Sequence, residues 1–305
     1  MLELGVAVEV GEVVDVLEVL VQAANSRPQD MTNTSNSIIT FFMVFSKTFP
    51  KTNIITYYQA LHIPVRAYIL LSAWCCAYNL AMHITHRHSW QVTTAEAKTI
   101  QLQLAGEVVR EGKLTNPRLI AGVDISVNRW DKTGTGAVVV LDYPSLEIVE
   151  VKVVTDKVTF PYVPGLLTFR EAPLILAALE ELTVTPDLLM VDGQGIAHPR
   201  RIGLAAHLGL CLGIPTIGCA KSRLCGECGE LPFEQGSHAG LFDNGEVIGA
   251  VVRTRTGVKP LYVSIGHMID LDGAIHWVEE CCRGYRLPEP TRLAHQGAGG
   301  HLSKK

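Results

Sequence analysis

Leu119-Ile-Ala-Gly-Val-Asp124-Ile-Ser-Val127 is an apolar stretch that contains a single carboxylate. Its length and its β-branched residues predict a buried strand. Two further strands are predicted at residues 136–143 and 146–155, and only short turns separate the three. Because short turns join antiparallel neighbours, this part of the chain predicts a three-strand meander.

Helices and strands alternate after the meander. The apolar pattern predicts a helix at 168–182, a strand at 187–192, a helix at 200–212 and a strand at 214–219. Two further strands at 246–253 and 261–266 and a closing helix at 270–282 follow this alternating run. Alternation implies parallel pairing, because each helix returns the chain to the same edge of the sheet. Upstream, Thr93 and Glu96 fit a capping box that begins a helix. We therefore predict an α/β fold: a mixed sheet, with an antiparallel three-strand meander followed by alternating helices and parallel strands, flanked by helices.

The composition limits the partners and the compartment. The 305 residues carry a net charge of −4, so any nucleic acid must bind a local basic patch. Acidic residues interrupt the apolar residues near the start, which is not the pattern of a secretory signal. Cys225 and Cys228 form a C-x-x-C motif, but no second pair stands at zinc-site spacing. We expect a reduced, cytoplasmic protein without structural zinc.

Residues 1–89 do not share the orderly pattern of the rest. Their longest apolar run, residues 67–82, is shorter than the roughly 20 residues that usually span a bilayer. A membrane span, an interfacial helix and a non-native extension all remain open for this run. We assign residues 1–89 to an extension of unknown role that is poorly ordered or non-native, residues 90–292 to the domain, and residues 293–305 to a flexible, Gly-rich tail.

Two aspartates are the main candidates for chemistry. Asp124 lies within an apolar strand, where an unpaired carboxylate costs several kcal/mol, so it must meet a cation, a metal or a donor. Asp192 ends a buried strand before Gly193-Gln194-Gly195, at the edge where open α/β sheets carry their sites. Each has a structural alternative, a loop cap for Asp124 and an Asx turn for Asp192. If their strands pair, the two carboxylates suit Mg²⁺ or Mn²⁺.

Three other polar side chains have two interpretations each. Glu171 fits a capping box with Thr168, and it is also a third carboxylate. Lys221 follows a strand and either positions a phosphate or is solvated. His267 ends a strand and either transfers a proton or only bonds to backbone.

Two loops are candidates for contact with a ligand. Tyr162 lies between Pro161 and Pro164, which stiffen the backbone so that it can present an exposed ring. His198-Pro199-Arg200-Arg201 opens a predicted helix, whose free N–H groups and two guanidinium groups would hold an anion. The alternatives are an ordinary turn and a solvated helix start.

Taken in order, these motifs resemble the endonuclease V family of deoxyinosine 3′ endonucleases. The resemblance runs from about Trp90 to Arg292 and rests on eight segments: Gly122-Val-Asp-Ile-Ser126, Pro161-Tyr-Val-Pro-Gly165, Phe169-Arg-Glu171, Val191-Asp-Gly-Gln-Gly195, His198-Pro-Arg-Arg201, Gly218-Cys-Ala-Lys-Ser-Arg-Leu224, Gly266-His267 and Gly284-Tyr-Arg-Leu-Pro-Glu-Pro-Thr-Arg292. One such motif is weakly specific, whereas eight in order with natural spacing are highly specific.

The resemblance implies a ribonuclease-H-like fold and a Mg²⁺-dependent reaction, with Mn²⁺ as a substitute. The family hydrolyses the second phosphodiester bond 3′ to a deaminated adenine, leaves 3′-hydroxyl and 5′-phosphate ends, and starts DNA repair. By position, Asp124 and Asp192 would be metal ligands and Glu171 the third acidic residue. Lys221 and His267 would assist at the scissile phosphate.

The resemblance also implies how damaged DNA is read. Tyr162 would be the wedge that enters at the lesion, where stacking by one ring contributes about 1–3 kcal/mol. The other implied contacts to lesion or DNA are Pro161, Pro164, Gly165, Leu166, Leu167, Gly193, His198, Arg200 and Arg201. We expect a monomer that binds a damaged duplex or single strand without a stable protein partner.

Some alternatives remain open. Position 194 is Gln, where many relatives are expected to carry His or another polar residue, and residues 1–89 match nothing in the family. An inosine-specific endoribonuclease would use the same residues, so RNA remains an alternative substrate. A non-cleaving inosine binder is expected to lack one acidic residue, whereas all three are present. A membrane-tethered interaction protein would rest on residues 67–82 alone.

Overall fold

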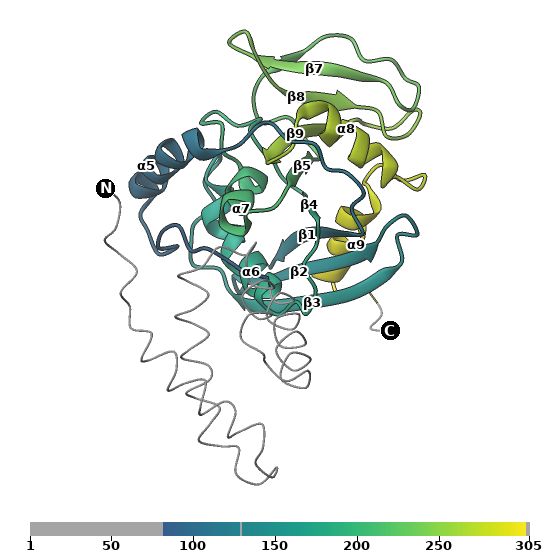
Figure 1. Ribbon diagram of the computed structural model, residues 1–305. Helices are drawn as coiled ribbons and strands as arrows, with labels where there is room; N and C mark the ends of the chain where they lie inside the picture. Colours follow the sequence, from purple (N-terminus) through teal and green to yellow (C-terminus); the bar gives the residue numbers. More distant parts are fainter. Residues whose placement is uncertain (1–81, 129, 303–305) are drawn as a thin grey trace, which may run out of the picture. The chain divides into compact units, whose positions relative to one another are not determined.

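A computed structural model describes residues 82–128 and 130–302. In this part of the chain, nine strands form one sheet in the order β3-β2-β1-β4-β5-β9-β8-β7-β6 (Figure 1). The order places β1 beside β4, in the interior of the sheet. β1 therefore has neighbours on both sides, and its residues from Ile120 to Asp124 are buried, as the apolar pattern predicts.

The predicted meander is present. β1 (Leu119–Val127), β2 (Thr133–Asp142) and β3 (Ile148–Lys157) pair antiparallel. β4 (Leu188–Val191) then pairs parallel with β1, and β5 (Thr216–Ala220) pairs parallel with β4. The condition under which Asp124 and Asp192 would face one point, that their strands pair, is therefore met.

The second half of the sheet is antiparallel. β9 (Leu261–His267) pairs with β5, and β8 (Glu246–Val252) pairs with β9. β7 (His238–Asp243) and the two-residue β6 (Glu227–Cys228) complete this edge. The sequence pattern predicted β8 and β9 but not β6 or β7, which are half-exposed and carry weak alternation.

Helices cover both faces of the sheet (Figure 1). α6 (Leu167–Glu180) and α7 (Leu204–Leu212) pack on one face, where they share a core with alternate residues of β1 such as Val123. α8 (Leu271–Glu280) and α9 (Glu289–Ala298) pack on the other face, against Ile120. α5 (Thr94–Leu104) precedes the sheet, continues into a short 3-10 turn, η2 (Ala105–Glu107), and carries the predicted Thr93–Glu96 capping box.

The domain boundary predicted at residue 90 lies too late in the chain. Met82 is buried in the α6–α7 core, and the Thr85 N–H donates to the Cys211 carbonyl at 2.8 Å. His88 Nε2 lies 2.7 Å from His207 Nε2. Residues 82–89 are therefore part of the folded unit. The predictions for residues 1–81, which include all but the last residue of the apolar run at 67–82, fall outside the described residues.

The tail predicted from residue 293 is wrong for its first six residues, because α9 continues to Ala298. Ala294, Gly297 and Ala298 are buried against the sheet. A Cβ at Gly122 would collide with the backbone of Pro290, so glycine lets α9 approach β1 closely. Among the described helices, none is long and apolar enough to cross a membrane.

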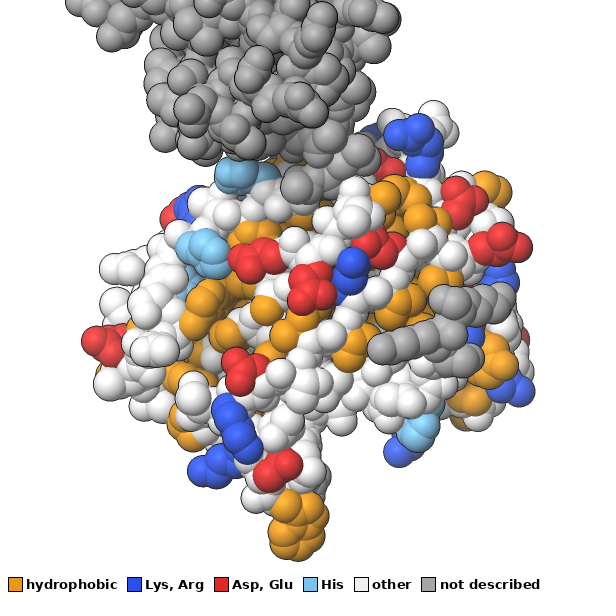
Figure 2. Space-filling view, turned by 90° about the horizontal axis from the view of Figure 1, so that it is seen from below, with side chains coloured by type: hydrophobic (Ala, Val, Ile, Leu, Met, Phe, Trp, Pro, Cys, Tyr) orange, Lys and Arg blue, Asp and Glu red, His pale blue; other side chains and the backbone are white. Residues whose placement is uncertain are grey.

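The β3 edge of the sheet forms much of the face in Figure 2. Acidic and hydrophobic side chains are interspersed on that face, and β3 carries three exposed apolar side chains, Ile148, Val149 and Val153. Among the residues that can be described on this face, Lys and Arg form no continuous patch. It therefore does not provide the local basic surface that a polyanion requires.

Candidate active site

The site lies at the carboxyl end of β4, beside the part of the parallel strand β1 that carries Asp124. Val123 pairs with Val191, so the next residue of each strand, Asp124 and Asp192, lies at the same level. The Asp192 N–H donates to the Val123 carbonyl at 3.3 Å, which ties the two strand ends together. The parallel register thus brings two carboxylates 68 positions apart to one edge of the sheet.

His295 of α9 completes a three-residue group with these aspartates. One ligand atom from each of Asp124, Asp192 and His295 lies within 4.8 Å of the others. His295 Nδ1 is 2.6 Å from Asp124 Oδ2, so an imidazole N–H donates to the carboxylate. The sequence prediction missed His295, because residues 293–305 were assigned to a tail. The signal was Pro288-Glu-Pro290, since proline is tolerated in the first turn of a helix.

Glu171 is the third carboxylate of this region. Burial, followed by the negative charges of Asp124 and Asp192, raises its pKa to about 8. The capping box predicted for Thr168 and Glu171 is not formed. α6 begins at Leu167 without a side-chain cap, and Thr168 is buried within the first turn. The Glu171 carboxylate therefore does not cap the start of α6. We call Asp124, Glu171, Asp192 and His295 the acidic cluster.

Lys221 follows β5 and forms an ion pair with Asp192. Burial and the Asp124 charge raise the pKa of Asp192, while the Lys221 ammonium acts in the opposite direction. Arg286 Nη2 donates to the Lys221 carbonyl at 2.6 Å, and Gln194 Nε2 donates to the Ser222 carbonyl at 2.9 Å. Gln194 thus holds the segment that carries Lys221.

The acidic cluster fits a small divalent cation. Two carboxylates and an imidazole converge within one ion's reach, and the charges of Asp124 and Asp192 also act on Glu171. Carboxylate oxygens suit Mg²⁺, and the added imidazole suits Mn²⁺ as well. Burial, followed by repulsion between the carboxylates, raises the pKa values of Glu171 and Asp192, and a bound cation would lower both.

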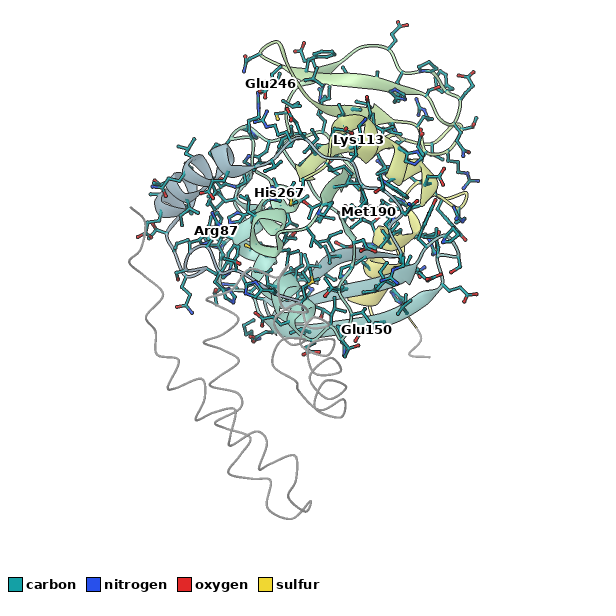
Figure 3. The ribbon with its side chains drawn as sticks, viewed as in Figure 1. Arg87, Lys113, Glu150, Met190, Glu246 and His267 are labelled. Atoms are coloured by element: carbon teal, nitrogen blue, oxygen red, sulfur yellow. The ribbon has the colours of Figure 1, made fainter. Side chains whose placement is uncertain are left out.

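His267 does not belong to this site, so its predicted role at the scissile phosphate is wrong. β9 runs antiparallel to β5, and His267 pairs with Thr216 at the start of that strand. Lys221 follows the other end, roughly 13 Å away along the strand. His267 lies beside α7 (Figure 3) and accepts a hydrogen bond from the Val109 N–H at 3.2 Å. The alternative, a histidine bonded to backbone, is what the structure shows.

The loop between β3 and α6, residues 158–166, presents the predicted exposed ring. We call it the aromatic loop. Tyr162 is 71% exposed, and the flanking Pro161 and Pro164 are exposed as well. Phe160 is buried against Phe169, with ring centroids 5.7 Å apart. The loop thus has a buried stem and a projecting aromatic tip.

The residues after this tip turn inward. Leu166 is fully buried, its N–H donates to the Val163 carbonyl at 2.9 Å, and Leu167 begins α6, so a pocket lined by backbone groups here stays a prediction. Gly193 is half-buried beside Leu204 of α7. Among the predicted pocket residues, Gly193 lies next to the acidic cluster because it directly follows Asp192 in the chain.

The anion site predicted at His198-Pro199-Arg200-Arg201 is not formed. α7 begins at Leu204, so these residues lie in a loop before the helix. Arg200 donates to the Gly165 carbonyl and to Gln101, whereas Arg201 forms ion pairs with Asp243 and Glu246. Both guanidinium groups already have internal partners, because the loop packs against its neighbours instead of facing solvent.

The chain is similar to known proteins across this whole region. Residues 102–296 match the family described as Endonuclease V. The chain is 54% identical over 211 residues to the Endonuclease V of Gloeobacter violaceus, covering 68% of this chain and 86% of that protein.

Solved structures agree with this match. The Endonuclease V of Streptomyces avermitilis superposes with a TM-score of 0.66 at 40% identity, covering 70% of this chain and 94% of that one. The Endonuclease V of Ciona intestinalis, in complex with a 24mer DNA containing an inosine followed by a ribo-adenosine, superposes with a TM-score of 0.59 at 27% identity, covering 68% of this chain and 96% of that one. The mixed sheet with flanking helices is a ribonuclease-H-like fold.

Proposed function

The chain belongs to the endonuclease V family, and from this membership we propose that it is a Mg²⁺-dependent DNA repair endonuclease that recognises deoxyinosine. The proposed reaction hydrolyses the second phosphodiester bond 3′ to the lesion and leaves 3′-hydroxyl and 5′-phosphate ends. The observation that supports it most is the convergence of Asp124, Asp192 and His295 at the edge of the sheet. The relative from Ciona intestinalis binds inosine-containing DNA, which supports the proposed substrate.

The acidic cluster would hold the metal through Asp124, Asp192 and His295. A bound divalent cation neutralises charge on a phosphate and lowers the pKa of a water nucleophile. Glu171, whose pKa is raised to about 8, is half-protonated near that pH and would exchange a proton with water at the cluster. Lys221, which forms an ion pair with Asp192, would contact a phosphate oxygen of the substrate.

Tyr162 would open the base stack at the lesion. Its ring projects from a stem held by Phe160, so it can enter the strand without first becoming ordered. A deaminated base pairs weakly, and unstacking it therefore costs less than unstacking an intact pair. Recognition would rest on the aromatic loop, and chemistry would rest on the acidic cluster.

The direct test is a nicking assay. One duplex carries a single inosine, and a matched duplex carries adenine at the same position. We expect Mg²⁺-dependent nicking of the inosine strand alone, one nucleotide beyond the lesion on its 3′ side. Equal nicking of both duplexes, or full nicking in EDTA, would refute the proposal.

A second candidate, an inosine-specific endoribonuclease, is favoured by one observation. The DNA bound by the Ciona intestinalis protein has a ribo-adenosine directly after the inosine, so that relative accommodates a 2′-hydroxyl there. Competition between inosine-containing RNA and DNA of the same sequence would separate the two functions. A higher kcat/KM for RNA would make the ribonuclease the primary activity.

A further inference from the structure

The carbonyl oxygen of Gly165, at the end of the aromatic loop, accepts three hydrogen bonds. The donors are Gln101 Nε2 at 3.1 Å, His198 Nε2 at 2.9 Å and Arg200 Nη2 at 2.7 Å. A carbonyl oxygen has two lone pairs, and most accept one or two bonds. These donors come from α5 and from the loop before α7, so two distant segments meet on one peptide group.

The donors are themselves fixed. Gln101 is fully buried, and its amide also donates to the Ile202 carbonyl at 3.2 Å and accepts from Arg200 Nε at 2.7 Å. His198 Nδ1 accepts from the Arg200 backbone N–H at 3.1 Å, which leaves the proton on Nε2 facing Gly165. Burial lowers the pKa of His198 to about 4, so this neutral tautomer persists at neutral pH.

Gly165 is also the position where the backbone needs glycine. Its φ is +77°, in the left-handed region, and a Cβ would lie 3.0 Å from Arg200 Nη2. The other end of the loop is held as well, because Arg170 Nη1 donates to the Phe160 carbonyl at 2.7 Å. Between these two anchors, Tyr162 stands exposed on four residues that include two prolines.

We propose that Gln101, His198 and Arg200 are positioning residues that hold the aromatic loop through the Gly165 carbonyl and so set how strongly the protein prefers inosine over an intact base. We call this arrangement the Gly165 clamp. It rests on the proposed function and deepens it. A ring that is already ordered loses little entropy when it enters the strand, so the clamp contributes to binding without touching the substrate.

The adjacent arginine supplies a matched control. Arg201 has the same charge and length as Arg200, yet its ion pairs go to Asp243 and Glu246, at the end of the β7–β8 hairpin where Figure 3 labels Glu246. Arg201 Nη1 also donates to the His198 carbonyl at 3.0 Å, and the Arg201 backbone N–H donates to the same oxygen at 2.8 Å. Arg201→Met keeps the backbone bond and all three donors to Gly165, so it removes a guanidinium from the same motif without releasing Gly165. Arg200→Met removes two of the hydrogen bonds around Gly165 and Gln101.

The loop itself is measured first. Hydrogen–deuterium exchange of the peptide covering residues 158–166 needs no substrate, so it tests the clamp even if the proposed function fails. We expect His198→Leu and Arg200→Met to exchange this peptide at least about tenfold faster than wild type. His198→Gln keeps an N–H donor in the place of Nε2 and should restore slow exchange. Unchanged exchange in both His198→Leu and Arg200→Met would overturn the proposal.

Discrimination is measured next, with inosine and adenine duplexes in metal-free buffer. We expect the ratio of the two affinities to fall about tenfold in Arg200→Met and to stay within about twofold in Arg201→Met. Nicking at saturating enzyme with Mg²⁺ should stay within about threefold of wild type, because the acidic cluster is intact. Equal losses in Arg200→Met and Arg201→Met would overturn the proposal.

A milder variant covers the case in which Arg200→Met does not fold. Arg200→Lys keeps the charge but has one nitrogen, which cannot reach both Gly165 and Gln101. We expect the same changes in exchange and discrimination, smaller in size. Wild-type behaviour of Arg200→Lys in both measurements would count against the clamp.

Discussion

The acidic cluster and the Gly165 clamp meet at the first turns of α6, and they are opposite in character. The acidic cluster brings Asp124, Glu171 and Asp192 into mutual repulsion, which the positive charges of Arg170, Lys221 and His295 offset only in part. In the clamp, each donor around Gly165 has its acceptor and the histidine is neutral. Unbalanced charge suits a place where a cation binds, whereas satisfied hydrogen bonds suit a place that must hold its shape.

The largest effect is expected from removing charge from the acidic cluster. Asp124→Asn and Asp192→Asn should each lower Mg²⁺-dependent nicking by at least about a thousandfold, because an amide is a weak ligand for a hard cation. Binding of the inosine duplex should change by less than about threefold, since the aromatic loop is untouched. Nicking assays and gel shifts measure both. Near-native nicking by either variant would show that the cluster does not hold the metal.

The next effect distinguishes two histidines, His295 of α9 in the acidic cluster and His267 at the end of β9. His295→Ala should weaken Mn²⁺ binding and lower nicking by about 10–100-fold, because His295 contacts the carboxylates. His267→Ala should leave nicking within about threefold and instead lower the free energy of unfolding, because the Val109 N–H loses its acceptor. Calorimetry with Mn²⁺ and urea unfolding distinguish these results. A larger loss of nicking in His267→Ala would reverse the assignment.

A smaller effect is the pH dependence of stability that Glu171 imposes on the metal-free protein. Its folded pKa of about 8 lies above the ordinary value of 4.5, so the folded state holds the proton more tightly. This stabilisation is complete below pH 4.5 and is lost as the pH rises through 8. Urea unfolding in EDTA at pH 6 and pH 9 should show the loss, and Glu171→Gln should remove it. A slope of equal size in Glu171→Gln would point to another group.

The smallest effect concerns the clamp and has the opposite sign with pH. The folded pKa of His198 is about 4, below the ordinary 6.5, so the folded state disfavours the charged ring. Its contribution is complete above pH 6.5 and is lost as the pH falls toward 4, by about 1–2 kcal/mol at pH 5. Unfolding of wild type and His198→Gln at pH 7 and pH 5 measures this. His207, whose pKa is lowered to about 3, contributes to both proteins alike, so it cancels in the comparison.

The local pattern of apolar residues and turns in the sequence predicts most of the fold. β1 occupies the predicted residues, and the meander follows from short turns between apolar runs. Alternation of helices and strands implies parallel pairing, and the pairing of β1 with β4, which the sequence left as a condition, places Asp124 beside Asp192. These predictions succeed because period and turn length act over a few residues.

The failures involve contacts between distant segments. His267 ends a strand and His295 follows the Pro288-Glu-Pro290 helix start, so neither context excludes a role at the site. The antiparallel direction of β9 takes His267 away from the carboxylates, whereas the packing of α9 brings His295 to them. Arg200 and Arg201 are adjacent in sequence, yet their partners lie in different parts of the fold. Glu171 has capping-box spacing with Thr168, but the buried Thr168 side chain leaves the helix end uncapped. No local pattern encodes these outcomes.

The route of the chain to the acidic cluster has a consequence for protein synthesis. β1 supplies Asp124 and α9 supplies His295, 171 residues later. Because Gly122 has no Cβ, the backbone of Pro290 lies directly against it, and α9 therefore packs closely on β1. A nascent chain that has grown as far as Asp192 already holds its carboxylates, yet it lacks the histidine until α9 has left the ribosome. A half-made chain therefore carries an incomplete nuclease site, and translation order itself delays its assembly.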